Sequence, residues 1–124
     1  MKRLKIWGRE LEAQGSPYTY LVFKDEFGGD LGAQLARAYA GDGESYDIEE
    51  FLRIIWAMCK TASDDVEDYE RWLEQWPLEK FTVLEGVEQL AVMMDAIEAE
   101  LFRGRQTLSR RLRRRVAAGL LALL

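Results

Sequence analysis

The stretch DIEEFLRIIWAMCK, residues 47–60, decides the fold because apolar side chains surround most of the helix that it would form. Its polar side chains after the first residue are Glu49, Glu50, Arg53 and Lys60. At about 100° per residue these four fall in one narrow stripe, so the rest of the helix surface must be covered by other elements. The residues that we expect at the centre of the core are Phe51, Leu52, Ile55 and Trp56.

Local sequence signals also predict where this helix begins. Asp47 is a residue type that accepts hydrogen bonds from the unpaired amides of a first helical turn. Tyr46 and Phe51 have the spacing of an apolar pair that brackets a helix start. We therefore expect a central helix that begins directly after Asp47.

Length and composition indicate one soluble globular domain. The chain has 124 residues, of which 48% are apolar and 31% are charged. All 22 acidic residues lie in residues 1–100, whose formal charge is −12, whereas residues 101–124 carry seven arginines and no acid. We divide the chain into a globular domain, 1–104, and a basic amphipathic C-terminal helix or tail, 105–124.

The N-terminal part of the domain, residues 1–24, has the pattern of a β-ribbon. Residues 3–13 read as two short strands joined by a two-residue turn at Gly8-Arg9. Tyr18–Lys24 is rich in aromatic and β-branched residues, which predicts a further strand after a break at Ser16-Pro17. Two or three strands alone are marginal, so we expect helices to cover their apolar face.

Residues 25–104 are expected to be helical around the central helix. One helix covers 25–40, or starts only at Asp30 because Gly28 and Gly29 disfavour its first turn. A short helix follows from Asp64 to Trp76, and a long one runs from Thr82 to Gly104. The apolar stripe of the long helix is Leu84, Val87, Leu90, Ala91, Met94, Ile97 and Leu101. The predicted class is α+β, mainly helical, with a small antiparallel ribbon packed on about four or five helices.

The composition restricts the chemistry of the chain. It has no histidine, which excludes a histidine-dependent catalytic triad, and its single cysteine, Cys59, lies in the most apolar helix, where a thiol is ordinarily inert. The acidic run 64–70 lacks the alternating ligand spacing of a calcium loop, and Gly28-Gly29 is not followed by a phosphate-loop lysine. We expect no catalytic, cofactor-binding or metal-binding residues and a protein that is not an enzyme.

Candidate residues for partner binding come from two segments. In the acidic helix 64–76, Tyr69, Trp72 and Trp76 share one face, which we expect to turn mainly inward. Trp76, next to Pro77 at the helix end, is the best candidate for a partly exposed contact. The second set consists of the tail arginines Arg110, Arg111, Arg113, Arg114 and Arg115.

The basic tail has several alternative uses. We rank docking on the acidic body of the protein itself, or on a partner, ahead of nucleic acid or an anionic membrane. No aromatic cluster stands beside the arginines to stack on bases, and the final apolar run of nine residues is too short to cross a bilayer. The N-terminus lacks the apolar core of a secretory signal, so we expect a cytoplasmic protein.

Three blocks of the sequence together resemble a known family. They are Tyr20-x-x-Phe23 with Glu26-Phe27-Gly28-x-Asp30-Leu31, then Phe51-Leu52-x-Ile54-Ile55-Trp56-Ala57-Met58-x-Lys60-Thr61-Ala62, and Tyr69-Glu70-x-Trp72-Leu73. They resemble the small tail assembly chaperones of long-tailed bacteriophages and prophages of Gram-positive bacteria. The resemblance covers roughly residues 18–75, and the arginine-rich tail is outside it.

This resemblance implies a non-enzymatic protein of the bacterial host cytoplasm that takes part in virion assembly. It implies binding to the tape measure protein, with tail tube subunits as a second partner, and it leaves a homo-oligomer open. An acidic, amphipathic scaffold could cover the apolar stripes of a long client before the tail tube encloses it. The alternative function is a small nucleic-acid-associated or regulatory protein that acts through the arginine-rich tail.

Overall fold

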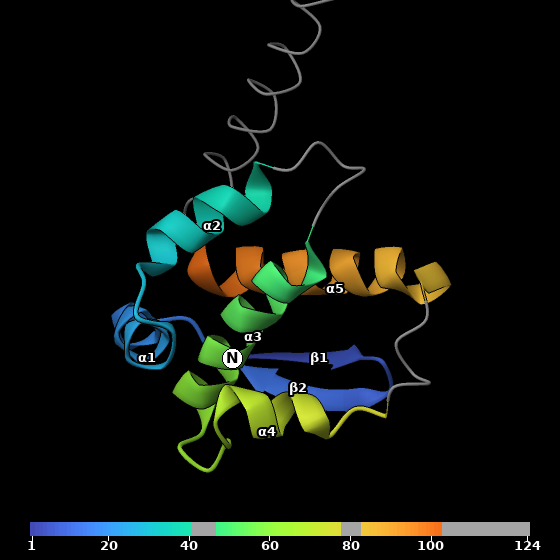
Figure 1. Cartoon of the computed structure of the whole chain (residues 1–124), viewed down its shortest axis with the longest axis horizontal. Helices are drawn as coiled ribbons and strands as arrows, with labels where there is room; N and C mark the ends of the chain where they lie inside the picture. The colour runs from blue at the N-terminus through green and yellow to red at the C-terminus, as the bar shows by residue number, and fades with distance from the viewer. Residues whose placement is uncertain (41–46, 78–82, 103–124) are drawn as a thin grey trace, which may run out of the picture.

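The computed structural model describes residues 1–40, 47–77 and 83–102, with the backbone alone at 83–85 and 87. Its elements are β1 (Lys2–Ile6), β2 (Arg9–Ala13), α1 (Pro17–Phe27), α2 (Leu31–Tyr39), α3 (Ile48–Ala62), α4 (Tyr69–Glu74) and α5 (Val83–Leu101). The β-hairpin packs on α3, with α5 along its β1 side and α4 beside β2, while α1 and α2 cover the other side of α3 (Figure 1). The predicted mainly helical α+β class is confirmed.

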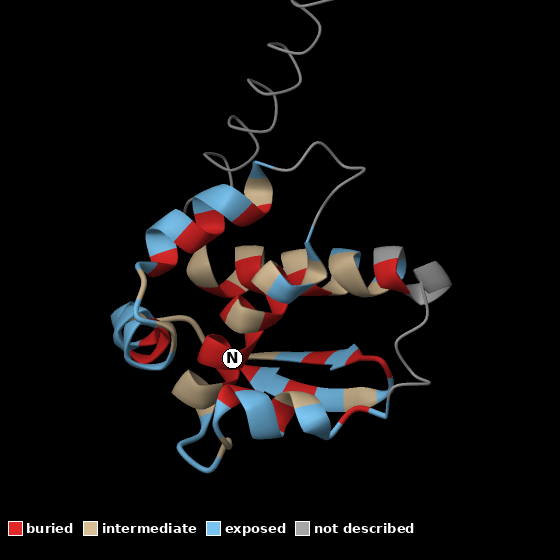
Figure 2. Cartoon of the chain, viewed as in Figure 1, coloured by how far each residue is buried: buried red, intermediate tan, exposed pale blue. Residues whose placement is uncertain are grey.

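Helix α3 is the centre of the core, as predicted from its apolar circumference. Phe51, Ile54 and Ile55 have no exposed surface, and Leu52 and Trp56 are exposed by only 4% and 2%. Every other helix and the hairpin pack against α3, whose buried residues are coloured red in Figure 2. The carboxylate of Asp47 accepts a hydrogen bond from the Glu49 amide (2.9 Å), which confirms the predicted helix cap. Tyr46 lies outside the described residues.

The hairpin is confirmed, but its turn lies one residue earlier than predicted. Ile6 pairs with Arg9, so the central turn residues are Trp7 and Gly8, whose φ angles are 45° and 79°. Two positive φ angles are typical of the hairpin turn whose twist matches the strands. Trp7 accepts this conformation because its side chain is buried and its amide donates to Gln89 Oε1 (2.8 Å). Tertiary packing therefore outweighs the preference for glycine at the first turn position.

The predicted strand at Tyr18–Lys24 is wrong, because this segment is the middle of α1 and the ribbon ends at Ala13. The Ser16 hydroxyl accepts from the Tyr18 amide, the Thr19 hydroxyl accepts from the Ser16 amide, and Pro17 occupies the first turn. These contacts form a capping box that satisfies amides at the helix start, and proline is well suited to this position. Local capping thus overrides the strand preference of the aromatic residues.

Several helix boundaries also differ from the prediction. Gly28, in the left-handed conformation, ends α1, and the Asp30 carboxylate caps α2, so the second of the two predicted starts is the observed one. The acidic run at 64–68 precedes a helix instead of forming it, since α4 begins at Tyr69 with Asp68 as its cap. Helix α5 ends at Leu101 instead of Gly104.

The buried face of α5 is rotated from the predicted apolar stripe. Met93, Ala96 and Ile97 are fully buried, whereas Ala91 is exposed. Two polar side chains belong to the face that meets the N-terminal segment: Gln89 accepts from the Trp7 amide and Glu100 accepts from the Gly15 amide. A stripe drawn through apolar residues alone misses such polar contacts.

Candidate protein-binding surface

The three aromatic residues proposed for partner binding, two on α4 and one just after it, are buried. Tyr69, Trp72 and Trp76 are exposed by 7%, 1% and 5%, so the expectation that Trp76 is partly exposed is wrong. The Trp76 indole donates to the carbonyl oxygen of Ile6 (3.1 Å), and the Trp72 and Trp76 rings meet edge to face at 4.7 Å. The helix is too short to be stable alone, and these rings hold it on the hairpin.

Arg9 on β2 completes this aromatic cluster. Its guanidinium lies 5.4 Å and 4.7 Å from the ring centres of Trp72 and Trp76 and donates to the Trp72 carbonyl oxygen (2.9 Å). Burial lowers the pKa of Arg9, and the nearby Glu67 carboxylate opposes this. The Arg9 guanidinium lies over both indole rings and bonds the Trp72 carbonyl oxygen. The cluster therefore stabilises the fold and leaves neither indole ring open for binding a partner.

Cys59 is buried, as expected of a thiol in the central helix. Burial raises the pKa of the Cys59 thiol from 9.0 to about 12, and burial likewise raises the pKa of the Tyr69 hydroxyl. A thiol that stays protonated near neutral pH is a poor nucleophile and metal ligand. Among the described residues, no group of three acidic or cysteine side chains is arranged to hold a metal ion.

These two pKa shifts predict loss of stability at alkaline pH. A pKa that is higher in the folded state than in the unfolded state means that the folded protein retains its proton longer. Stability is therefore complete below about pH 9 and should fall as pH rises toward 12. Urea denaturation at several pH values should show this decline, with a shallower slope for Cys59→Ala, in which only the Tyr69 contribution remains. A flat profile above pH 9 would contradict the burial of both groups.

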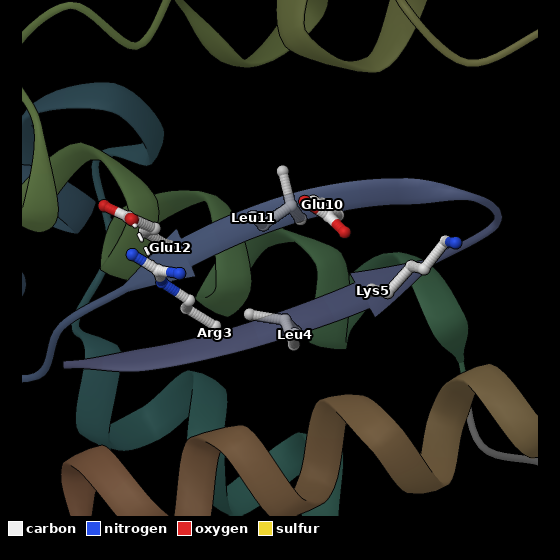
Figure 3. Close-up of a pocket in the computed structure, with 6 residues that line it drawn as sticks. All are labelled: Arg3, Leu4, Lys5, Glu10, Leu11 and Glu12. Atoms are coloured by element: carbon white, nitrogen blue, oxygen red, sulfur yellow. Dashed lines mark ion pairs between the residues drawn. The ribbon is translucent and has the colours of Figure 1, made fainter.

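A shallow pocket of about 520 Å³ lies on the hairpin, lined by Arg3, Leu4, Lys5, Glu10, Leu11 and Glu12 (Figure 3). Arg3 and Glu12 face each other across the strands and form an ion pair at 3.3 Å. Both side chains of this pair are largely exposed, so the pair contributes little to stability. Opposite charges alternate over the two strands, and the lining holds no serine, threonine or cysteine that could act as a hydroxyl or thiol nucleophile.

Helix α1 presents an apolar face to solvent. Tyr18, Tyr20 and Leu21 are exposed by 52%, 43% and 53%, and Met1 is the other large apolar residue that is exposed among the described residues. On a helix, positions 17, 18, 20 and 21 fall on one side, opposite Thr19, Val22 and Phe23, which are buried against the core. We call Pro17, Tyr18, Tyr20 and Leu21 the α1 face; Figure 2 shows the outward side of α1 as exposed.

The α1 face is held on a rigid support. The Thr19 and Thr61 hydroxyl groups are hydrogen bonded at 2.9 Å, which ties the start of α1 to the end of α3. At the other end, the Phe27 ring meets Trp56 and Tyr69 edge to face at 5.5 Å and 5.0 Å. Because the helix is already ordered, a partner that binds its exposed apolar groups loses less conformational entropy than one that binds a flexible segment.

The sequence reasoning missed Tyr18 and Leu21 because it treated their segment as a strand. The signal that could have found them is Ser16-Pro17 followed by Thr19, a helix start that the aromatic content obscured. The tail arginines, Arg110, Arg111, Arg113, Arg114 and Arg115, lie outside the described residues. No described helix is long and apolar enough to span a membrane.

Comparison of the chain with protein-family models, with curated proteins and with solved structures found no match.

Proposed function

We propose that the chain is a non-enzymatic tail assembly chaperone of a long-tailed phage or prophage. It acts in the cytoplasm of the bacterial host and binds the tape measure protein, with tail tube subunits as a second partner. The observation that supports this proposal is the α1 face, where Tyr18, Tyr20 and Leu21 are exposed on a helix fixed to the core. Exposed apolar residues gathered on one face are typical of protein-binding sites.

The α1 face also overlaps the blocks that resemble the family. Most of the block 51–62 is buried in α3, and Tyr69 and Trp72 of the block 69–73 are buried in α4, so these two blocks account mainly for the fold. In the first block, Phe23 is buried while Tyr20 faces solvent, and Leu21, at a position that the block leaves open, is also exposed. The first block therefore combines a structural role with residues that remain accessible to a client.

The tape measure protein has a property that explains why it would need a chaperone. A long tape measure chain exposes apolar stripes until the tail tube surrounds it, and such stripes aggregate. An amphipathic client helix could place its stripe on Tyr18 and Leu21, as in other complexes of a helix with an apolar surface. The acidic body, with a formal charge of −12 over residues 1–100, would keep the complex soluble.

Coexpression with the tape measure protein encoded in the same genome tests the proposal. The chain should keep the client soluble and elute with it on size exclusion. Changing Tyr18, Tyr20 and Leu21 together to serine should weaken capture at least about tenfold, because contact residues of this kind contribute about 1 to 2 kcal/mol each. Their exposure means that the change should alter folding stability little.

The matched control is the pair Ala33→Ser and Ala36→Ser, which changes exposed positions on α2 and should leave capture intact. A client that is equally insoluble with and without this protein, with no complex at micromolar concentration, would disprove the chaperone function. If the triple serine variant captures the client as well as the wild type does, the chaperone function would stand but the α1 face would not be the binding site.

A further inference from the structure

The exposed side of α1 carries charged groups as well as apolar ones. At about 100° per residue, Leu21 lies near the centre of this side. Tyr18 and Asp25 lie along one of its flanks, and Tyr20 and Lys24 lie along the other. All five residues are exposed, and within the described part of the chain neither Lys24 nor Asp25 forms an ion pair. One cation and one anion therefore border the α1 face.

This arrangement is self-complementary about a two-fold axis at Leu21. When two α1 helices pack antiparallel about such an axis, the same flanks of the two copies lie side by side. Asp25 of the second copy then comes within about 1.5 Å of the level of Tyr18 along the helix. On the other flank, Lys24 of the second copy comes within about 3 Å of the level of Tyr20.

Both tyrosines would then face a charged group that suits them. The Tyr18 hydroxyl can donate to the carboxylate of Asp25 in the second copy, and such charge-assisted bonds are stronger than neutral ones. The Tyr20 ring can attract the ammonium group of Lys24 in the second copy. Between these two contacts, Leu21 would pack on Leu21 of the second copy.

We propose that the α1 face binds a second copy of this chain, with the two α1 helices antiparallel and Leu21 at the two-fold axis. Figure 1 shows α1 at the outer edge of the described part of the molecule, so a second body can approach it. Residues 1–100 carry a formal charge of −12, so two copies repel each other in general. On the exposed side of α1 the charges of Lys24 and Asp25 cancel, which makes this side a favourable place for two acidic bodies to meet.

The size of the contact predicts a weak dimer. Tyr18, Tyr20 and Leu21 expose roughly 300 Å² between them, to which the neighbouring charged side chains add. A standard stable complex buries about 800 Å² on each partner, so the helix pair forms a reversible dimer. The dimer should be populated only at about 0.1 mM and above.

Dimer formation covers the same apolar residues that a client would use. A client must then compete with the second copy, so the dimer would protect the α1 face when no client is present. The dimer itself does not depend on the proposed client, because both partners are this chain. The experiments below contain no client, and their results are independent of the coexpression test.

Opposite charges at position 21 test the two-fold contact in the full-length protein. Leu21→Asp and Leu21→Lys should each weaken association at least about tenfold, because like charges then meet at the axis. A one-to-one mixture of the two variants should restore association, since a carboxylate then faces an ammonium group. Sedimentation equilibrium between about 10 µM and about 1 mM measures the dissociation constants.

The matched controls are Ala36→Asp and Ala36→Lys, which place the same charges on the exposed side of α2. They should associate as the wild type does, both alone and mixed. Leu21 is 53% exposed, so its variants should fold normally, and circular dichroism checks this. A wild type that stays monomeric at about 1 mM would overturn the proposal. Leu21 variants that associate like the wild type, or a mixture that stays monomeric, would overturn it as well.

Disulfide trapping with Leu21→Cys provides a second measurement. In two helices packed 8 to 10 Å apart, facing Cα atoms are about 5 Å apart, which suits a disulfide. Under mild oxidation Leu21→Cys should form linked dimers at least about tenfold faster than the control Ala36→Cys. The native Cys59 is buried and should contribute little in either protein. Equal rates for the two variants would contradict the placement of Leu21 at the axis.

Discussion

Replacing Trp56 by alanine should lower the free energy of unfolding by roughly 3 to 5 kcal/mol. Trp56 is exposed by only 2%, and its indole donates to the Glu67 carbonyl oxygen (2.8 Å) in the segment between α3 and α4. Its ring also meets Phe27 of α1 edge to face at 5.5 Å. The truncation would leave a cavity among three segments and an unpaired carbonyl group. Chemical denaturation followed by circular dichroism measures the effect.

Two further variants show which contacts of Trp56 matter. Trp56→Phe keeps an aromatic ring in the core but loses the hydrogen bond to Glu67, so its cost should be clearly smaller than that of alanine. Tyr20→Ala removes a surface aromatic and should change stability by less than about 0.5 kcal/mol. A loss under about 1 kcal/mol for Trp56→Ala would mean that α3 is not the centre of the core.

The central helix could be predicted because its signals agree with one another. Asp47 caps the helix, and the positions from Phe51 to Cys59 other than Arg53 are apolar, which leaves few alternative arrangements. The burial of Phe51, Leu52, Ile55 and Trp56 follows from this pattern alone. Element type is reliable where capping, periodicity and composition all indicate the same structure.

Helix α1 was predicted as a strand because its local signals conflict. Tyr18, Tyr20 and Val22 favour a strand by composition, whereas Ser16, Pro17 and Thr19 together form a helix start. The capping contacts satisfy backbone amides directly, so they decide the outcome. The error had a functional consequence, because the exposed face of α1 is visible only once the segment is treated as a helix.

The inward orientation of α4 depends on residues that are distant in sequence. Trp76 is beside a proline at the helix end, where exposure is a reasonable expectation, but it donates to the Ile6 carbonyl oxygen across 70 positions of the chain. The turn at Trp7-Gly8 brings the hairpin into place for this contact. A one-residue difference in the turn changes which side chains face α4, and local periodicity cannot determine it.

Replacing Gly15 by alanine should lower the free energy of unfolding by roughly 2 to 3 kcal/mol. The new Cβ atom would lie 2.5 Å from the carbonyl oxygen and 2.7 Å from the carbonyl carbon of Glu100. Both are backbone atoms of α5, so no change of side-chain rotamer can relieve the overlap. Either α5 or the segment before α1 must move, and movement would stretch the bond from the Gly15 amide to Glu100. Thermal and urea denaturation of the full-length protein measure the loss.

Gly29→Ala is the matched control for this prediction. Its Cβ atom would meet no heavy atom within 4 Å, and Gly29 has no positive φ angle, so the change should be neutral or slightly stabilising. If both alanine variants are equally stable, α5 does not pack closely against residue 15. A selective loss in Gly15→Ala would support the close packing of the end of α5 against the segment that leads into α1.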